Sequence, residues 1–256
     1  MNYGICNLSM IPLRIEPNDK SEMVSQILFG EHFKVLDKSK QWRKIRLAFD
    51  KYEGWIDEKQ YLEISKEYHI ELNSNPIFVS NELVDFASHV NNQLLTIPLG
   101  STLPFYHKGS FSLQSEKFSF EGKVASAKGK KGAIIKTAFM YLNAPYLWGG
   151  KTPFGIDCSG LTQMVYKLNG YKLLRDASQQ ATQGEVLSFI EESEPGDLAF
   201  FDNNEGEIIH VGIIMANNHI IHASGCVRID RIDQSGIFNE QIKKHTHKLR
   251  VIKKIF

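Results

Sequence analysis

Short apolar stretches at strand spacing dominate the first quarter of the chain. Residues 33–36 are rich in apolar side chains, and Ile45 and Leu47 stand two positions apart, which is the period of a β-strand. Residues 54–56 form another short strand-like segment. Turn-prone segments separate the pieces, at 16–19, 29–30 and 37–41. Several short strands at this spacing predict a small β-barrel or sandwich over residues 1–64.

The pattern is weaker over residues 65–125. Residues 82–90 fit one or two helical turns, whereas 96–105 and 110–120 alternate polar with apolar side chains, as strands do. We therefore expect a second, divergent β module. The next stretch, 122–132, is rich in glycine and lysine and poor in large apolar residues, which is typical of a solvated linker.

Beyond this linker the pattern becomes helical and then returns to strands. Residues 133–141 fit an amphipathic helix that Pro145 ends. Residues 158–168 carry apolar side chains at i, i+3, i+4 and i+7, and Gly170 follows where a helix cap belongs. Three later segments have strand character: 198–201, 210–215 and 219–222. Asn217-Asn218 predicts a tight turn between the last two.

Composition narrows the function classes. The chain has 256 residues, enough for two or three domains and a sizeable core. Its 30 basic and 29 acidic residues give a net charge of +1, so neither nucleic acid nor an anionic membrane is expected as a partner. No window approaches the ~18 apolar residues of a membrane-spanning helix. The N-terminus lacks a basic region followed by an apolar run, so no signal peptide is visible and we expect a cytoplasmic protein.

Three cysteines, Cys6, Cys158 and Cys226, are too few and too scattered for a disulfide framework or a zinc finger. Cys158 directly follows Asp157, whose side chain suits the N-cap of the helix expected at 158–168. Unpaired backbone N–H groups and the helix dipole favour an anion in that first turn, and the thiolate is the reactive form of cysteine. The position therefore indicates a nucleophile. The alternative is that Cys158 packs as a small hydrophobe.

Two histidines supply a candidate base. His210 and His222 are separated by an even spacing of 12 and flank the predicted tight turn, so they should face each other on one side of a hairpin. One imidazole would take the thiol proton and the other would fix its tautomer. Each alone would fit a hydrogen-bonded structural role. His219 should point to the opposite face and lie at the surface.

Six segments, in this order, resemble the NlpC/P60 cysteine peptidases: 145–150 (PYLWGG), 155–160 (GIDCSG), 175–180 (RDASQQ), 195–198 (PGDL), 210–213 (HVGI) and 221–223 (IHA). Residues 1–120 resemble bacterial SH3 modules more loosely. The resemblance implies an α+β fold in which a papain-like catalytic domain at 126–256 follows small β-barrel SH3-like modules at 1–64 and 65–125.

The resemblance also implies roles for individual residues. Cys158 would be the nucleophile, His210 the base and His222 the orienting third residue, with no metal or cofactor. Substrate contacts would come from Tyr146, which could also serve the oxyanion hole, and from Asp157 and Ser159.

Further contacts are carried over from the same relatives. An acidic and an aromatic residue of the first SH3-like module would hold the free amine of the substrate's L-Ala, and the candidates are Glu22 and either Trp55 or Tyr61. Ser178 would contact the D-Glu carboxylate, although Asp176 and Ser178 equally fit a loop-bracing or capping pair.

The chain is similar to the γ-D-glutamyl-L-diamino acid endopeptidases of murein recycling. The expected substrate is a short murein-derived peptide whose free N-terminal L-Ala pairs with Glu22, and the expected reaction cuts the γ-D-Glu–diamino acid bond through a thioester. Three alternatives stay open: an exported hydrolase of intact peptidoglycan, a non-catalytic wall-peptide binding protein, and a zinc site built from Cys158, His210 and His222.

Overall fold

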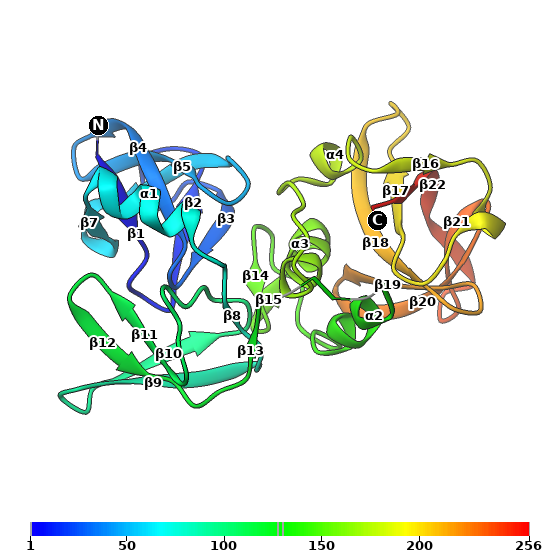
Figure 1. Cartoon of the computed structure of the whole chain (residues 1–256). Helices are drawn as coiled ribbons and strands as arrows, with labels where there is room; N and C mark the ends of the chain where they lie inside the picture. The colour runs from blue at the N-terminus through cyan, green and yellow to red at the C-terminus, as the bar shows by residue number, and fades with distance from the viewer. Residues whose placement is uncertain (1, 127, 130, 256) are drawn as a thin grey trace. The chain divides into compact units, whose positions relative to one another are not determined.

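The computed structural model describes residues 2–126, 128–129 and 131–255, and the chain forms two compact units, residues 1–127 and 128–256 (Figure 1). No helix among the described residues is long and apolar enough to cross a bilayer. The linker predicted at 122–132 includes Ala127 and Lys130, which lie outside the described residues. Its ends are not linker: a strand covers Val124–Ala125 and a helix begins at Lys131.

The first unit begins with a small closed barrel built on a seven-stranded sheet, in the order β3-β2-β6-β5-β4-β1-β7. The strands are β1 (Tyr3–Ile5), β2 (Met10–Arg14), β3 (Met23–Leu28), β4 (His32–Ser39), β5 (Trp42–Leu47), β6 (Glu53–Asp57) and β7 (Leu62–Ile64), with a 3₁₀ turn, η1, at Glu58–Gln60. Inward side chains alternate with half-exposed ones, as in β2, where Ile11 and Leu13 are fully buried. This confirms the β character predicted for residues 1–64.

The rest of the first unit is a helix and a second β module. The elements are α1 (Lys66–Ser74), β8 (Val79–Ser80), β9 (Val84–His89), β10 (Leu94–Pro98), β11 (Ser110–Leu113), β12 (Glu116–Ser119) and β13 (Val124–Ala125), with the four-stranded order β10-β9-β12-β11. The helical turns expected at 82–90 are wrong. That segment is β9, because Phe86 pairs with Thr96 and the ladder with β10 outweighs the local pattern.

One hydrophobic cluster joins the second module to the barrel. It combines Ile5 and Phe29 of the barrel segment with Leu72 of α1 and with Ile97 and Phe111 of the second sheet. Residues 1–127 are therefore one compact unit, and the domain boundary placed at residue 64 stays a prediction.

Two histidines in the first unit make its stability depend on pH. Burial, and then the neighbouring His69, lower the pKa of His32 to about 4, and burial also lowers the pKa of His69. Above pH 6.5 both are neutral and the native state carries no penalty. As pH falls from 6.5 to 4, these histidines bind protons in the unfolded chain but not in the native state. The free energy of unfolding therefore falls, by up to about 3 kcal/mol for His32.

We expect the His32→Gln variant to lose part of this slope. Urea unfolding of the variant and the parent at pH 7.5 and pH 4.5 measures it, with the parent losing more stability between the two pH values. Equal losses in the two proteins would contradict the assignment.

The second unit packs helices on an antiparallel sheet, in the order β16-β22-β17-β18-β19-β20-β21, and a further pairing of β21 with β22 closes the sheet on itself. The helices are α2 (Lys131–Phe139), α3 (Cys158–Leu168) and α4 (Ala177–Gln180), with a 3₁₀ turn, η2, at Ile190–Glu192. The strands are β14 (Lys151–Thr152), β15 (Gly155–Ile156), β16 (Glu185–Leu187), β17 (Leu198–Asp202), β18 (Ile208–Met215), β19 (His219–Ser224), β20 (Cys226–Asp233), β21 (Gly236–Asn239) and β22 (Lys244–Lys254).

These elements confirm most of the predicted pattern. The helix expected at 158–168 is α3, and the strands expected at 198–222 are β17, β18 and β19 (Figure 1). The tight turn at Asn217-Asn218 is present, with φ of 58° and 56°, the left-handed values that a two-residue hairpin loop needs. Every residue of α3 is buried, and the helix packs against β18 and β19. The predicted α+β class is confirmed.

Candidate active site

Cys158 occupies the first turn of α3, where the sequence placed it. Asp157 is the N-cap: its backbone is extended, and its Oδ1 accepts a hydrogen bond from the Gly160 N–H at 2.6 Å. The Cys158 side chain is only 7% exposed. Backbone N–H groups of Val211 and Ser159 donate to its sulfur. Val211 lies on β18 and directly follows His210 in the chain, so the contact with its N–H places the thiol at the strand that carries His210.

Burial dominates the protonation of this thiol. It raises the pKa of Cys158 to about 12, and the adjacent Asp157 carboxylate acts in the same direction. The N–H groups of Val211 and Ser159 and the Arg175 guanidinium lower the pKa, but by less. The N–H of Ser159, at the start of α3, does favour the thiolate as expected, but the loss of water on burial outweighs it in the resting site. The thiol is neutral and needs a base.

The two histidines meet on one face of the β18–β19 hairpin. His222 pairs with Gly212, two positions from His210, so the imidazoles are diagonal neighbours and not directly opposed. His210 Nε2 and His222 Nδ1 are 2.9 Å apart, and both side chains are buried. A Cβ on Gly212 would lie 2.9 Å from the His222 Cβ, so glycine there leaves room for the His222 side chain.

His210 is neutral at rest. Burial lowers its pKa well below the ordinary value, and repulsion by His222 and by His247 lowers it further. The His247 ring, from β22, stacks on the His210 ring with centroids 4.2 Å apart. A neutral imidazole beside a neutral thiol can accept its proton once a reacting carbonyl takes up the developing charge on sulfur.

A carboxylate that sequence reasoning missed continues the line of hydrogen bonds. Asp230 Oδ2 lies 2.9 Å from His222 Nε2. Arg228 Nη2 donates a hydrogen bond to Asp230 Oδ1 at 2.9 Å, and Arg228 Nε forms an ion pair with Asp230 Oδ2 at 2.8 Å. The signal in the sequence was the even spacing of 8 between His222 and Asp230 across the turn at Gly225, which places both on one face of the β19–β20 hairpin. His247, on a distant strand, had no such signal.

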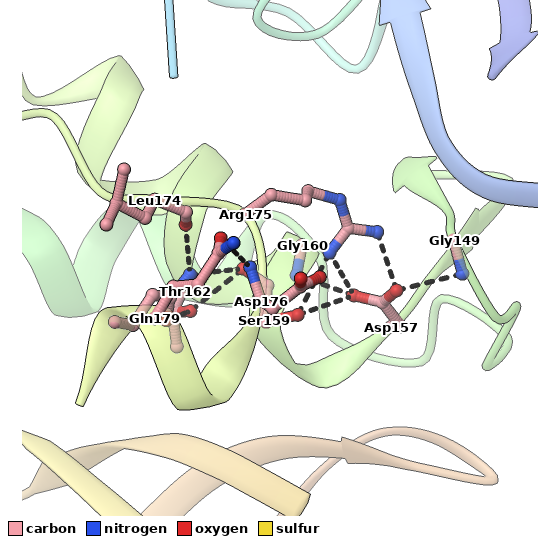
Figure 2. A network of polar contacts seen from close by, with 10 residues as sticks. Gly149, Asp157, Ser159, Gly160, Thr162, Leu174, Arg175, Asp176 and Gln179 are labelled. Atoms are coloured by element: carbon pink, nitrogen blue, oxygen red, sulfur yellow. Dashed lines mark hydrogen bonds and ion pairs between the residues drawn. The ribbon is translucent and has the colours of Figure 1, made fainter. Parts of the chain in front are cut away.

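A buried ion pair fixes the start of α3 (Figure 2). Arg175, 1% exposed, donates from Nη1 to Asp157 Oδ1 at 3.0 Å and from Nη2 to Asp157 Oδ2 at 2.6 Å. Its Nη1 also donates to Ser159 Oγ at 2.9 Å, and the Gly149 N–H donates to Asp157 Oδ2 at 2.9 Å. These contacts hold the residues on either side of Cys158. The substrate contacts expected of Asp157 and Ser159 stay predictions.

Tyr146 is half-buried at the same centre. Burial raises its pKa to about 12, and electrostatic repulsion from Cys158 and Asp157 acts in the same direction. Its backbone N–H donates to the Gly225 carbonyl at 2.9 Å. The role of Tyr146 in substrate binding or in the oxyanion hole stays a prediction.

The remaining predicted substrate contacts come from α4 and from the first unit. Ser178 is exposed on α4, and Asp176 is the N-cap of that helix, in a capping box in which the Asp176 N–H donates to Gln179 Oε1 at 3.2 Å. The contact of Ser178 with the D-Glu carboxylate stays a prediction. Glu22 and Trp55 belong to the first unit, Trp55 half-buried in β6. Tyr61 is buried against Phe33, which leaves Trp55 as the more exposed aromatic candidate.

Within the part of the chain that the structure describes, no group of three or more His, Cys, Asp or Glu side chains is arranged to hold a metal ion. The geometry therefore offers no support for the zinc alternative.

Comparison with known proteins identifies the two parts. Residues 143–251 match the NlpC/P60 family, and residues 13–60 match the bacterial dipeptidyl-peptidase SH3 domain. The chain therefore contains an NlpC/P60 domain preceded by a bacterial SH3 domain, as the motifs indicated.

Several proteins that this chain resembles in sequence are peptidases by name. The chain is 29% identical to the gamma-D-glutamyl-L-lysine dipeptidyl-peptidase of Bacillus subtilis over 216 residues, 78% of this chain and 71% of that protein. It is 27% identical to dipeptidyl-peptidase 6 of Lysinibacillus sphaericus, covering 84% and 85%. An NlpC/P60 family protein from Bacillus cereus shares the fold over 99% of both chains, with a TM-score of 0.83 at 19% identity.

Proposed function

We propose that this chain is a cysteine endopeptidase that hydrolyses the γ-D-Glu–diamino acid bond of murein-derived peptides. The NlpC/P60 domain and the peptidase names of the relatives support the cysteine-type peptidase class. The observation that carries the proposal is the buried Cys158 thiol at the start of α3, in contact with the backbone N–H of Val211, the residue that follows a neutral His210 whose Nε2 contacts His222.

The reaction follows from these contacts. As the substrate carbonyl reaches Cys158, the thiol proton passes to His210 and the sulfur bonds to the carbonyl carbon. The Ser159 N–H, which contacts the sulfur, and the Tyr146 hydroxyl stabilise the oxyanion. His210 then gives its proton to the leaving amine, which frees the diamino acid. Water, deprotonated by His210, hydrolyses the thioester and releases the γ-carboxylate of D-Glu.

The selection of short peptides is the finer part of the proposal. The carboxylate of Glu22 pairs with the free amine of L-Ala, Trp55 forms an aromatic wall beside it, and Ser178 contacts the D-Glu carboxylate. An amine that must be free excludes peptides still joined to glycan, which suits recycling of turnover fragments in the cytoplasm.

A substrate panel tests the proposal. We expect the purified chain to release the diamino acid from L-Ala-γ-D-Glu-meso-diaminopimelate or its L-Lys analogue, and Cys158→Ala to release none. N-acetylation of the L-Ala should lower kcat/KM by about 10²-fold, since a charge-assisted pair is lost. Chromatographic assay of the released diamino acid measures each rate.

The variant Glu22→Gln isolates the amine contact. It should slow cleavage of the free peptide and leave the acetylated peptide unaffected, whereas the exposed Glu16→Gln should change neither. Activity on intact sacculi that is indifferent to acetylation would favour the exported hydrolase, and absence of turnover on every substrate would favour a binding protein.

A further inference from the structure

A single line of hydrogen bonds runs from His210 to a buried carboxylate on β20. His210 Nε2 contacts His222 Nδ1, and His222 Nε2 contacts Asp230 Oδ2, each at 2.9 Å. Asp230 is 8% exposed and His222 is 1% exposed. Both ring nitrogens of His222 are thus engaged, so the proton positions along the line depend on one another.

Asp230 is the fixed end of this line. Burial alone would raise its pKa, but hydrogen bonds from His222 and Arg228 outweigh burial and hold the pKa below the ordinary value. An ionised carboxylate only accepts hydrogen bonds. The proton between His222 and Asp230 therefore sits on His222 Nε2.

The remaining proton positions follow from that one. When the His222 ring carries one proton, its place on Nε2 leaves Nδ1 bare, so Nδ1 accepts a hydrogen bond from His210 Nε2. Neutral His210 then carries its proton on Nε2 and has a bare Nδ1. Of the two His210 nitrogens, Nδ1 is the one left for the Cys158 proton.

The surroundings keep the His210 ring in this orientation. His247 stacks on it, and Phe201 packs at a tilt with centroids 5.8 Å apart. The charged or titratable groups that contact the line include Arg228 on β20 and His247 on β22.

We propose that Asp230 is a positioning residue that sets the tautomers of His222 and His210, so that His210 Nδ1 is the base. Arg228 keeps the carboxylate in place through its two contacts. This inference rests on the proposed peptidase function for its rate effect, but the tautomers themselves belong to the resting protein.

The test compares Asp230→Asn with Asp233→Asn. Asp233 is also on β20 and also pairs with a histidine, His245, but both are exposed and outside the site. An asparagine at 230 can donate to His222 Nε2 and so reverse both tautomers. We expect kcat to fall about 10²–10⁴-fold with KM changed less than about threefold, and Asp233→Asn to match the parent.

Imidazole ¹⁵N NMR gives a readout that folding damage does not imitate. In the parent protein the His210 Nδ1 resonance should be of the unprotonated type and Nε2 of the protonated type, and Asp230→Asn should exchange them. A protonated His210 Nδ1 in the neutral parent, or an Asp230→Asn variant within threefold of parental kcat, would overturn the proposal. If the parent cleaves no peptide, the peptidase proposal fails while the NMR test still decides the tautomers.

Discussion

His210→Ala is expected to lower kcat/KM by at least about 10³-fold. The reason is the buried thiol, whose pKa of about 12 leaves a thiolate fraction on the order of 10⁻⁵ at pH 7 when no base assists. Steady-state cleavage of the free peptide measures the loss. His219→Ala is the matched control, because His219 lies on the same hairpin with its side chain toward the opposite face.

The pH profile separates loss of the base from loss of the fold. Without His210, hydroxide in solution must remove the thiol proton, so the residual rate should rise about tenfold per pH unit between pH 7 and 9. The parent and His219→Ala should rise far less. His210→Gln, which fills more of the buried site, should behave like His210→Ala. A His210 variant that keeps more than a tenth of the parental rate would refute its role as base.

Local chemistry explains what could be predicted from the sequence. The start of α3 depends on Asp157 as N-cap and on an apolar period within eleven residues, and both are visible in a single stretch. The shared face of His210 and His222 depends on an even spacing across a short turn. Interactions confined to one helix or one hairpin leave their pattern in adjacent residues.

Features set by distant partners could not be predicted in the same way. The strand at 84–89 exists because it pairs with its neighbours, and His247 reaches His210 from 37 positions away. The pKa of Cys158 depends on how completely α3 is covered, which no local pattern states. Asp230 lies between these two cases. Its even spacing from His222 predicts that both side chains share a face, but only if a second strand is known to follow the turn at Gly225.

The buried ion pair between Arg175 and Asp157, next to the nucleophile in sequence, is expected to stabilise the second unit strongly. Arg175→Met should destabilise the second unit by about 3–5 kcal/mol, since it leaves the Asp157 carboxylate buried without its cation. Chemical denaturation followed by a probe in residues 128–256 measures the change. Arg231→Met is the control: its pair with Glu240 is exposed, with a 3.5 Å contact, and should cost less than about 1 kcal/mol.

A double-mutant cycle shows whether the charge or the packing matters. Asp157→Asn combined with Arg175→Met removes both charges and keeps a side chain that can cap α3, so it should recover most of the stability lost in Arg175→Met alone. Equal stability of the single and double variants would mean that Arg175 acts through packing.

The same pair should also govern the reactivity of the thiol. Asp157 raises the pKa of Cys158 and Arg175 lowers it, so removing Arg175 alone leaves the anion to oppose thiolate formation. Alkylation of Cys158 by iodoacetamide at pH 8 should therefore be slower in Arg175→Met than in the parent, and faster again in the double variant. Equal alkylation rates in all three proteins would limit the ion pair to a structural role, in which it holds the first turn of α3 without tuning its sulfur.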